Sequence, residues 1–349
     1  MSAPAPGVAT LRELVARATS APSPHNAQPW HWTIHPDRVE LALDSSVAER
    51  LDVNDPDRRE LVISCGAALL TFRVAAAQAL FETRPEILPD PGRPDLLAVV
   101  AVVPGAVDSA FATLHDVVAR RRTVWGAFDP TPLPPGLADR LGVEALVEGA
   151  RLVAVGPGER DSLAELVERA DRARYADPRR RAELAGWITS RWAEGPPVEG
   201  EYAGQVPEAV PHQDLGERIA AHDGRLLRDA PHLAVLSTPG DDRRSWVMAG
   251  QALQRVLLVA AEHRIFGGFL NASCQIPPER TRLRDLVSGR GYPQVVLRLG
   301  RPVNLPPATS RRPVGDVVTV HSGPDGLRRG QLVVSPREAG ADFTEDVLG

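Results

Sequence analysis

The ten residues from Ala21 to Trp30 could bind a planar, polar ligand. Pro22, Pro24 and Pro29 stiffen this segment, so its backbone is predicted to be a rigid turn that cannot be helical. Short polar side chains lie between the prolines: Ser23, Asn26 and Gln28. Hydrogen-bond donors and acceptors held at fixed positions suit the polar edge of a cofactor.

Three consecutive arginines, Arg120, Arg121 and Arg122, form a second segment with chemical potential. They follow apolar residues at helical spacing, so one interpretation is a solvated helix end that the helix dipole favours. The other is a phosphate clamp, because guanidinium groups match phosphate oxygens in two-point contacts. The arginines alone fit both interpretations.

A glycine pair and a late basic spot complete the candidate segments. Gly267 and Gly268 could let a flat ligand lie against bare backbone amides, although a plain helix stop is the alternative. Arg311 and Arg312 form the basic spot. His25 is the single candidate for a general acid, and a structural hydrogen bond is its alternative role.

A helix and a β-hairpin are predicted to flank the rigid turn. Thr10 and Glu13 have the spacing of a capping box, and apolar residues then recur at helical spacing up to Ala18. After the turn, apolar and polar residues alternate over 30–34 and again over 39–43. The turn is therefore expected to connect the helix to the hairpin.

Two long, alanine-rich helices are predicted to form the core. The first covers 57–81 with Asp57 and Glu60 as its N-cap pair, and the second covers 242–263. After an irregular stretch, each helix is followed by an apolar strand: 96–103 in the first case and 294–299 in the second. The repeated order suggests two similar units fused in one chain.

Shorter elements fill the remaining sequence. Helices are predicted up to about residue 147, over 161–193 and over 277–287, and strands over 151–155 and 232–237. Residues 85–94 are expected to break the chain. The Pro- and Gly-rich stretch 195–211 is a loop of unusual length, and such loops in compact domains often act as lids.

Composition narrows the classes of partner. With 349 residues, two domains are the natural expectation, and the net charge of −5 is small for this size. No basic run is interleaved with aromatic residues, so a nucleic-acid partner is not expected. No apolar stretch reaches the length that spans a bilayer, and no signal peptide opens the sequence. We expect a cytoplasmic protein that acts on a small molecule and binds no membrane.

The sequence contains no lysine, so all 40 basic residues are arginine. P-loop proteins, pyridoxal-phosphate enzymes and Schiff-base aldolases all need a lysine and are therefore excluded. The signatures of α/β-hydrolases, zinc proteases and dinucleotide-binding folds are also missing. Cys65 and Cys274 are interpreted as small core residues, and no metal site is expected.

Taken in order, these segments resemble the nitroreductase family of FMN-dependent oxidoreductases, and more closely its tandem, Acg-like branch. The resemblance covers about residues 10–318 and is strongest at 21–30, 58–69 and 293–300. It implies an α+β, nitroreductase-like fold in which two related α/β units in one chain imitate the homodimer of ordinary nitroreductases. The expected assembly is a pseudo-dimeric monomer or a higher homo-oligomer.

The resemblance also implies a division of labour along the chain. Residues 1–106 would supply the turn, and residues 107–318 would form the main FMN cradle with a lid-like loop at 195–213. Residues 319–349 would be a C-terminal extension, with a hairpin near 322–326.

The family's cofactor contacts can be carried over by position. Four groups of residues are implied to bind FMN: Pro22, Ser23, Pro24 and Asn26 in the turn; Arg121, Arg122 and Thr123 on phosphate, ribityl or pyrimidine oxygens; Gly267 and Gly268 facing flavin N5; and Arg311 and Arg312 on the phosphate. The sequence departs from the family pattern where Val124 replaces a serine, Gly126 a basic residue and Gly267 a glutamate.

The leading hypothesis is an oxidoreductase that transfers hydride through flavin N5, from NAD(P)H or a substrate C–H to an acceptor. The alternative is a protein that sequesters FMN beneath the 195–213 loop with little NAD(P)H turnover. A third hypothesis is an oxidase that acts on a tailored metabolite.

Overall fold

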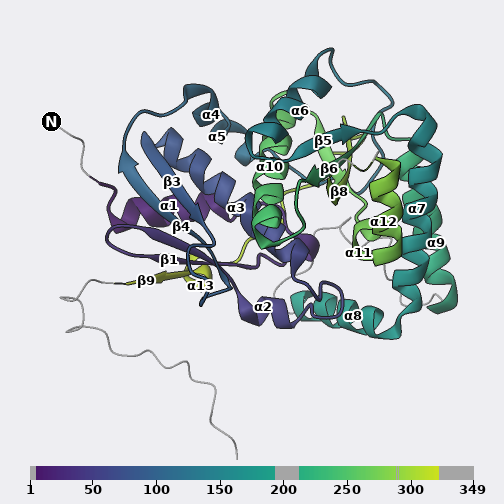
Figure 1. Ribbon diagram of the computed structural model, residues 1–349, viewed down its shortest axis with the longest axis horizontal. Helices are drawn as coiled ribbons and strands as arrows, with labels where there is room; N and C mark the ends of the chain where they lie inside the picture. The colour runs from purple at the N-terminus through teal and green to yellow at the C-terminus, as the bar shows by residue number, and fades with distance from the viewer. Residues whose placement is uncertain (1–4, 193–211, 288, 290, 322–349) are drawn as a thin grey trace, which may run out of the picture.

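The computed structural model describes residues 5–192, 212–287, 289 and 291–321, and within them the chain forms two sheets flanked by helices. Figure 1 shows the sheets on opposite sides of two central helices, α3 (Arg59–Gln78) and α10 (Arg243–Glu262). The α+β architecture agrees with the prediction. The predicted loop at 195–211 and the hairpin near 322–326 lie outside the described residues.

The first sheet has the strand order β3-β4-β2-β1-β9. The predicted hairpin is present as β1 (Trp30–Ile34) and β2 (Val39–Leu43), and β4 (Leu96–Pro104) pairs antiparallel with β2. The expectation of a chain break from residue 85 was wrong, because β3 (Phe81–Ile87) pairs along β4. Its Pro85 is tolerated since β3 is an edge strand, where a missing N–H group leaves no ladder partner unsatisfied.

The last strand of the first sheet comes from the far end of the described chain. β9 (Val318–Val320) pairs in parallel with β1, and α13 (Val314–Val317) precedes it. Val317 is fully buried in the core of the first sheet. Residues 314–320 therefore belong structurally to the first unit, although the sequence placed residues up to 318 in the second.

The second sheet has the order β5-β6-β8-β7. Three of its strands lie where the sequence predicted them: β5 (Arg151–Ala154), β6 (His232–Thr238) and β8 (Tyr292–Gly300). The fourth, β7 (Phe266–Phe269), contains the glycine pair that the sequence interpreted as a helix stop or a ligand platform. β7 pairs antiparallel with β8, so Gly267 and Gly268 are strand residues.

Helices α3 and α10 pack against each other through glycine. A Cβ atom added at Gly66 of α3 would collide with the carbonyl of Val247 in α10, so only glycine allows this approach. α3 is also long and apolar enough to cross a membrane, contrary to our expectation that no such stretch exists. It is 94% buried inside the protein over that window, as expected for a core helix.

The helix starts differ from the predicted capping pairs. α1 (Val8–Ala18) begins after Gly7 with no side-chain cap, so Thr10 and Glu13 do not form a capping box. At α3 the cap is Asp55 rather than Asp57, because the Asp55 carboxylate accepts from the N–H groups of Glu60 and Leu61 at 3.2 and 3.0 Å. A left-handed Arg58 brings Asp55 under these amides.

The remaining helices surround the second sheet or connect the two units. In chain order they are α2 (Ser45–Glu49), α4 (Ser109–Thr113), α5 (His115–Val118), α6 (Leu137–Val147), α7 (Pro157–Ala176), α8 (Pro178–Trp192), α9 (His212–Arg228), α11 (Ala272–Gln275) and α12 (Pro277–Leu286). α7 and α9 pack side by side and cover the outer face of the second unit (Figure 1).

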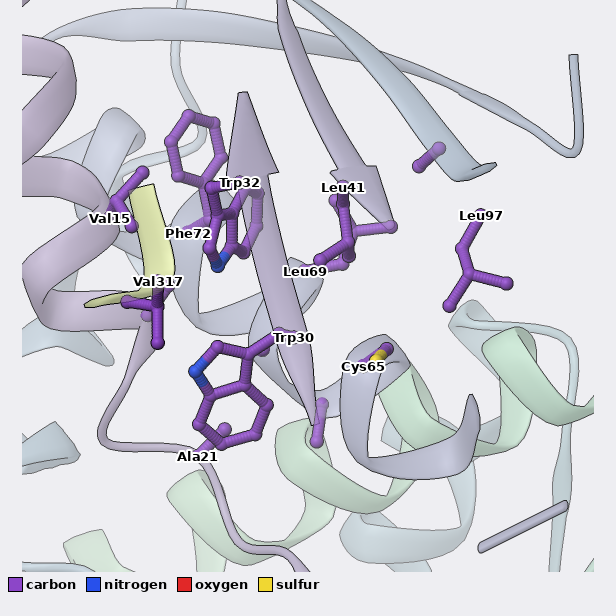
Figure 2. Close-up of a cluster of buried hydrophobic side chains, with 14 of the residues drawn as sticks. Val15, Ala21, Trp30, Trp32, Leu41, Cys65, Leu69, Phe72, Leu97 and Val317 are labelled. Carbon is purple, nitrogen blue, oxygen red and sulfur yellow. The ribbon is translucent and has the colours of Figure 1, made fainter. Parts of the chain in front are cut away.

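Two tryptophans anchor the core of the first unit. Trp30 and Trp32 are fully buried on the same face of β1, and the Trp32 ring stacks on Phe72 of α3 with centroids 5.1 Å apart. Figure 2 shows Val317 beside these rings, together with Cys65. Burying several large aromatic side chains against α3 fixes the direction in which the chain leaves the rigid turn and enters β1.

Candidate functional site

A cavity of about 940 Å³ lies where the two units meet. The rigid turn contributes one part of its wall, and the arginine segment 121–126 contributes another. Further lining comes from α3, α7 and α9, and from a segment at 304–309 that runs toward β9. A space of this size can enclose a large cofactor together with part of a substrate.

The turn has an unusual backbone conformation. His25, Asn26 and Gln28 all have left-handed φ values, of 51°, 53° and 52°. Pro24 to Asn26 form one turn of 3₁₀ helix, so the prediction that no helix occurs here was wrong at this single turn. Left-handed residues other than glycine persist only where their surroundings hold them, and they concentrate at functional sites.

One contact within the turn and two from other parts of the chain hold it in this conformation. The Ser23 hydroxyl accepts from the backbone N–H of Gln28 at 3.0 Å. Asn26 Nδ2 donates to the carbonyl of Ser310 at 3.0 Å, and Trp187 Nε1 of α8 donates to the carbonyl of His25 at 3.3 Å. The turn is therefore held both by a hydrogen bond within itself and by residues from the second half of the sequence, Trp187 and Ser310.

The arginine segment gathers positive charge beside the turn. Arg121 is 6% exposed and donates to the carbonyl of Ser20 at 3.1 Å, while Arg122 donates to the carbonyl of Ala119 at 2.7 Å. Within the described residues, neither Arg121 nor Arg122 pairs with a carboxylate, and the buried Nε of each has no partner. Arg121 is buried and Arg122 half-buried, and two neighbouring cations without a carboxylate partner attract anions.

The third cation beside this site is Arg311. Its Nε donates to the carbonyl of Thr19 at 2.6 Å, so it lies over the start of the turn. Burial first, and then the charges of Arg311 and Arg122, lower the pKa of Arg121 to about 9. The smaller, electrostatic part of this shift reflects repulsion among the three cations, which a bound phosphate would relieve.

The glycine pair lies behind the cavity wall rather than on it. Neither glycine lines the cavity, and a Cβ atom on Gly268 would stand 2.5 Å from the Val124 carbonyl oxygen and 2.7 Å from Arg298 Nη2. The Gly267 carbonyl accepts from the Val124 N–H at 2.9 Å. In the structure this pair holds the arginine segment against the second sheet, and the next residue, Phe269, lines the cavity.

Arg312 points away from the cavity and anchors the segment that leads to β9. Its guanidinium pairs with Asp44 at 2.9 Å, and its backbone N–H donates to Gln28 Oε1 at 2.9 Å. Gln28 is fully buried beneath the turn. Arg312 therefore positions the turn instead of contacting the space that a ligand would occupy.

A cluster of buried and half-buried titratable residues, which sequence reasoning missed, lines another part of the cavity. Asp171, Arg174 and Tyr175 come from α7, and Asp223 comes from α9. Burial and the neighbouring Asp223 raise the pKa of Asp171 well above its ordinary value, and burial raises the pKa of Asp223 to about 6. These residues were hidden because both helices are rich in charge, and spacing alone did not separate inward from outward carboxylates.

Arg298 of β8 connects this cluster to the arginine segment. It is 1% exposed, and its guanidinium donates to the carbonyls of Gly126 and Val124, both at 3.2 Å. Its charge lowers the pKa of Asp223, opposing the effect of burial. A buried arginine in the middle of an apolar strand was visible in the sequence, but the run 294–299 was interpreted only as a strand.

Comparison with known proteins shows which family the chain belongs to. No family model matches the sequence. It is 32% identical over 325 residues to the Mycobacterium tuberculosis protein named "Putative NAD(P)H nitroreductase Rv3131", covering 90% of this chain and 92% of the relative. The chain belongs to this nitroreductase family. It is also 27% identical over 332 residues to the M. tuberculosis protein named "Putative NAD(P)H nitroreductase acg", covering 89% of this chain and 96% of that one.

Solved nitroreductases cover a smaller share of the chain. The FMN-dependent nitroreductase NfnB from Mycobacterium smegmatis, solved with NADPH, is 19% identical and matches 63% of this chain and 99% of its own, with a TM-score of 0.40. NfnB from Sphingopyxis sp. strain HMH, described as FMN- and NADPH-dependent, is 21% identical and matches 60% of this chain and 99% of its own, with a TM-score of 0.42.

In this nitroreductase-family chain, most of the predicted site residues surround one cavity. The residues that line it are Pro22, Ser23, Pro24, His25, Asn26, Arg121, Arg122, Thr123 and Arg311. Gly267, Gly268 and Arg312 lie outside the lining and support it through the contacts described above. The sequence therefore located both walls of the cavity but not the acidic cluster.

Proposed function

We propose that this protein is an FMN-dependent oxidoreductase that takes hydride from NAD(P)H and passes it to a small-molecule acceptor. One observation carries the proposal: the turn 21–30 lines the same large cavity as Arg121 and Arg122, which pair with no carboxylate among the described residues. The names of the relatives, which describe NAD(P)H nitroreductases, support the same class of reaction.

The residues of the cavity fit the parts of FMN. Arg121 and Arg122 would bind the phosphate, because neither pairs with a carboxylate among the described residues. Arg311 lies beside them, and its charge contributes to the lowered pKa of Arg121. Ser23 and Asn26 would face polar groups of the cofactor. Apolar lining for the flat ring system is also present: Pro22, Pro24, Ile63, Leu253 and Phe269.

The cofactor would supply the redox chemistry, accepting and releasing hydride, and the protein would bind, orient and shield it. The left-handed turn presents fixed polar groups, so little reorganisation accompanies binding. Arg298 fixes the carbonyls of Val124 and Gly126 and so aims the arginine segment at the cavity. Gly267 and Gly268 do not line the cavity, so we assign them no direct role toward the flavin ring.

Cofactor binding followed by anaerobic reduction tests this function. The purified protein mixed with FMN should retain a yellow flavin after gel filtration, and NADPH should bleach the flavin absorbance rapidly without oxygen. A protein that retains no flavin would contradict the proposal. Binding with bleaching by dithionite alone would instead support the alternative of an FMN-sequestering protein, which rests on the 195–213 loop, whose residues 195–211 lie outside the described part of the chain.

The assembly and location form part of the same proposal. One chain already brings both cavity walls together, so we propose a pseudo-dimeric monomer as the working unit. A cytoplasmic location would give it access to NAD(P)H, and it would need neither a nucleic-acid nor a membrane partner. Sedimentation of the FMN-loaded protein tests the assembly. The flavin absorbance should sediment with a particle of the mass of one chain, and each chain should carry one flavin.

A further inference from the structure

Two carboxyl groups meet in the wall of the cavity. Asp171 of α7 and Asp223 of α9 both line it, and their side chains form a hydrogen bond with each other. Asp171 is 1% exposed, and its second carboxyl oxygen, Oδ2, has no hydrogen-bond partner among the described residues. Two carboxyl oxygens can share a hydrogen bond only when one of the groups carries a proton.

The surroundings keep the pair from losing that proton. Among the described residues neither carboxylate forms an ion pair within salt-bridge distance, although arginines lie near enough to act through space. The charged or titratable groups that act on the pair or stand next to it come from four elements: Arg172, Arg174 and Tyr175 of α7, His222 of α9, Arg298 of β8 and Glu60 of α3. The arginines favour one ionised carboxylate but do not offset two.

We propose that the Asp171–Asp223 pair delivers the proton that a two-electron acceptor needs when it is reduced in this cavity. The inference rests on the proposed oxidoreductase function. A quinone illustrates the balance: its reduction to the hydroquinone needs a hydride at one oxygen, which bound reduced flavin would supply with its electron pair, and a proton at the other oxygen, which the carboxyl pair would supply. The pair then regains its proton from water.

The two carboxyls have different roles in this step. Asp171 is the more deeply buried, and burial beside Asp223 keeps its pKa raised, so the shared proton resides on Asp171 in preference to Asp223. Asp223 is half-buried, and Arg298 and Arg174 stabilise its ionised form. Asp171 is therefore the donor, and Asp223 is the path by which a proton returns from solvent.

The choice of electron acceptor separates proton delivery from the rest of the cycle. Menadione accepts hydride and needs a proton, whereas ferricyanide accepts single electrons and needs none. In the FMN-loaded enzyme, Asp171→Asn should lower menadione turnover at least tenfold and leave ferricyanide turnover and flavin reduction by NADPH within twofold. The exposed Asp161 on the same helix provides a matched control, and Asp161→Asn should change neither acceptor.

A second variant keeps the test valid if Asp171→Asn does not fold. Asp223→Asn removes the neighbouring negative charge, which makes it easier for Asp171 to ionise and lowers its pKa. Because the donor acts only while protonated, menadione turnover should then decline at a lower pH than in the unmodified enzyme. An unchanged pH profile in Asp223→Asn would overturn the proposal, as would full menadione turnover in Asp171→Asn.

Infrared spectroscopy gives a readout that needs neither flavin nor turnover. A stretching band from a protonated buried carboxyl should persist at pH 7 in the unmodified protein, disappear in Asp171→Asn and remain in Asp161→Asn. Absence of that band at pH 7 overturns the shared proton. If the band is present but NADPH does not reduce bound flavin, the proposed function fails and the catalytic role fails with it, whereas the proton-sharing pair stands.

Discussion

The Cα atom of Gly66 lies only 2.8 Å from the position that a Cβ atom on Gly250 would occupy. This contact joins the central helices of the two units, and the same Cβ atom would collide with the carbonyl of Ile63 and stand 2.8 Å from the Ala67 nitrogen. Backbone atoms cannot move aside as a flexible side chain can. One methyl group at Gly250 must therefore push α3 and α10 apart.

We expect Gly250→Ala to destabilise the protein by about 3 kcal/mol, the upper end of the roughly 1–3 kcal/mol that overpacking typically costs, because the contacting atoms are backbone. Urea denaturation of the cofactor-free protein measures the change. Gly142 of α6 is the matched control, because nothing lies within 4 Å of its Cβ position. Gly142→Ala should leave stability unchanged or raise it by about 0.5–1 kcal/mol through helix propensity. Equal effects of the two substitutions would contradict the glycine-contact account.

Arg121→Gln should weaken FMN binding by about 10- to 100-fold, because a charged hydrogen bond to phosphate contributes roughly 1.5–3 kcal/mol. Fluorescence titration of flavin gives the dissociation constant. The exposed Arg12 of α1 carries the same charge far from the cavity, so Arg12→Gln controls for the change in net charge. Loss of affinity in both variants, or in neither, would show that Arg121 does not bind the phosphate.

The cap of α3 predicts a specific pH dependence of stability. Burial first, and then the charge of Glu60, raise the pKa of Asp55 to about 6. Between the unfolded pKa near 3.8 and about pH 6 the folded protein keeps a proton that the unfolded chain has released. Stability from this group is thus full below about pH 4 and falls as the pH rises toward 6, by up to about 3 kcal/mol.

Asp55→Asn removes that titration and retains one acceptor for the helix amides. Relative to the unmodified protein, the variant should gain stability between pH 4.5 and pH 7.5, measured by chemical denaturation at both values. Asp57→Asn, at the exposed position that the sequence favoured as the cap, should show no such gain. A parallel pH dependence in the unmodified protein and Asp55→Asn would refute the role of Asp55.

Arg298→Gln should disturb the cavity wall without touching the turn. The substitution removes donors to the Val124 and Gly126 carbonyls, and losing a charged hydrogen bond costs about 1.5–3 kcal/mol. We expect a lower unfolding free energy and weaker FMN binding together. Asp223 would also lose a nearby cation, so its pKa should rise further. FMN affinity equal to that of the unmodified protein would show that the segment 124–126 holds its position without Arg298.

The sequence predicted the elements with strong local patterns and missed those defined by distant partners. The two central helices and the strand at 294–299 carry long apolar patterns, so their existence was predictable within a few residues. β3 was missed because Pro85 indicates a break, and its strand character depends on lying at a sheet edge. β9 was missed because three residues form a strand only when β1 is beside them.

The residues of the candidate site divide in the same way, into those with a local sequence pattern and those that depend on distant partners. Pro22 to Asn26 and Arg121 to Thr123 are contiguous motifs, and the structure brings them to one cavity. Both Arg311 and Arg312 were assigned to the ligand, but of the two only Arg311 lines the cavity, whereas Arg312 pairs with Asp44. The sequence of a loop does not determine which of two adjacent side chains points toward a cavity. The pairing of Asp171 with Asp223 depends on two helices packing, which no local pattern encodes.

The parallel pairing of β9 with β1 has a consequence for synthesis on the ribosome. Trp32 and its partner Val318 are separated by almost the whole described chain, so this pairing cannot form until residue 320 has emerged. Asn26 likewise waits for Ser310 before its side chain has that partner. The first unit is therefore translated early but finished late, and the cavity can first accept a ligand when nearly all of the chain has been made.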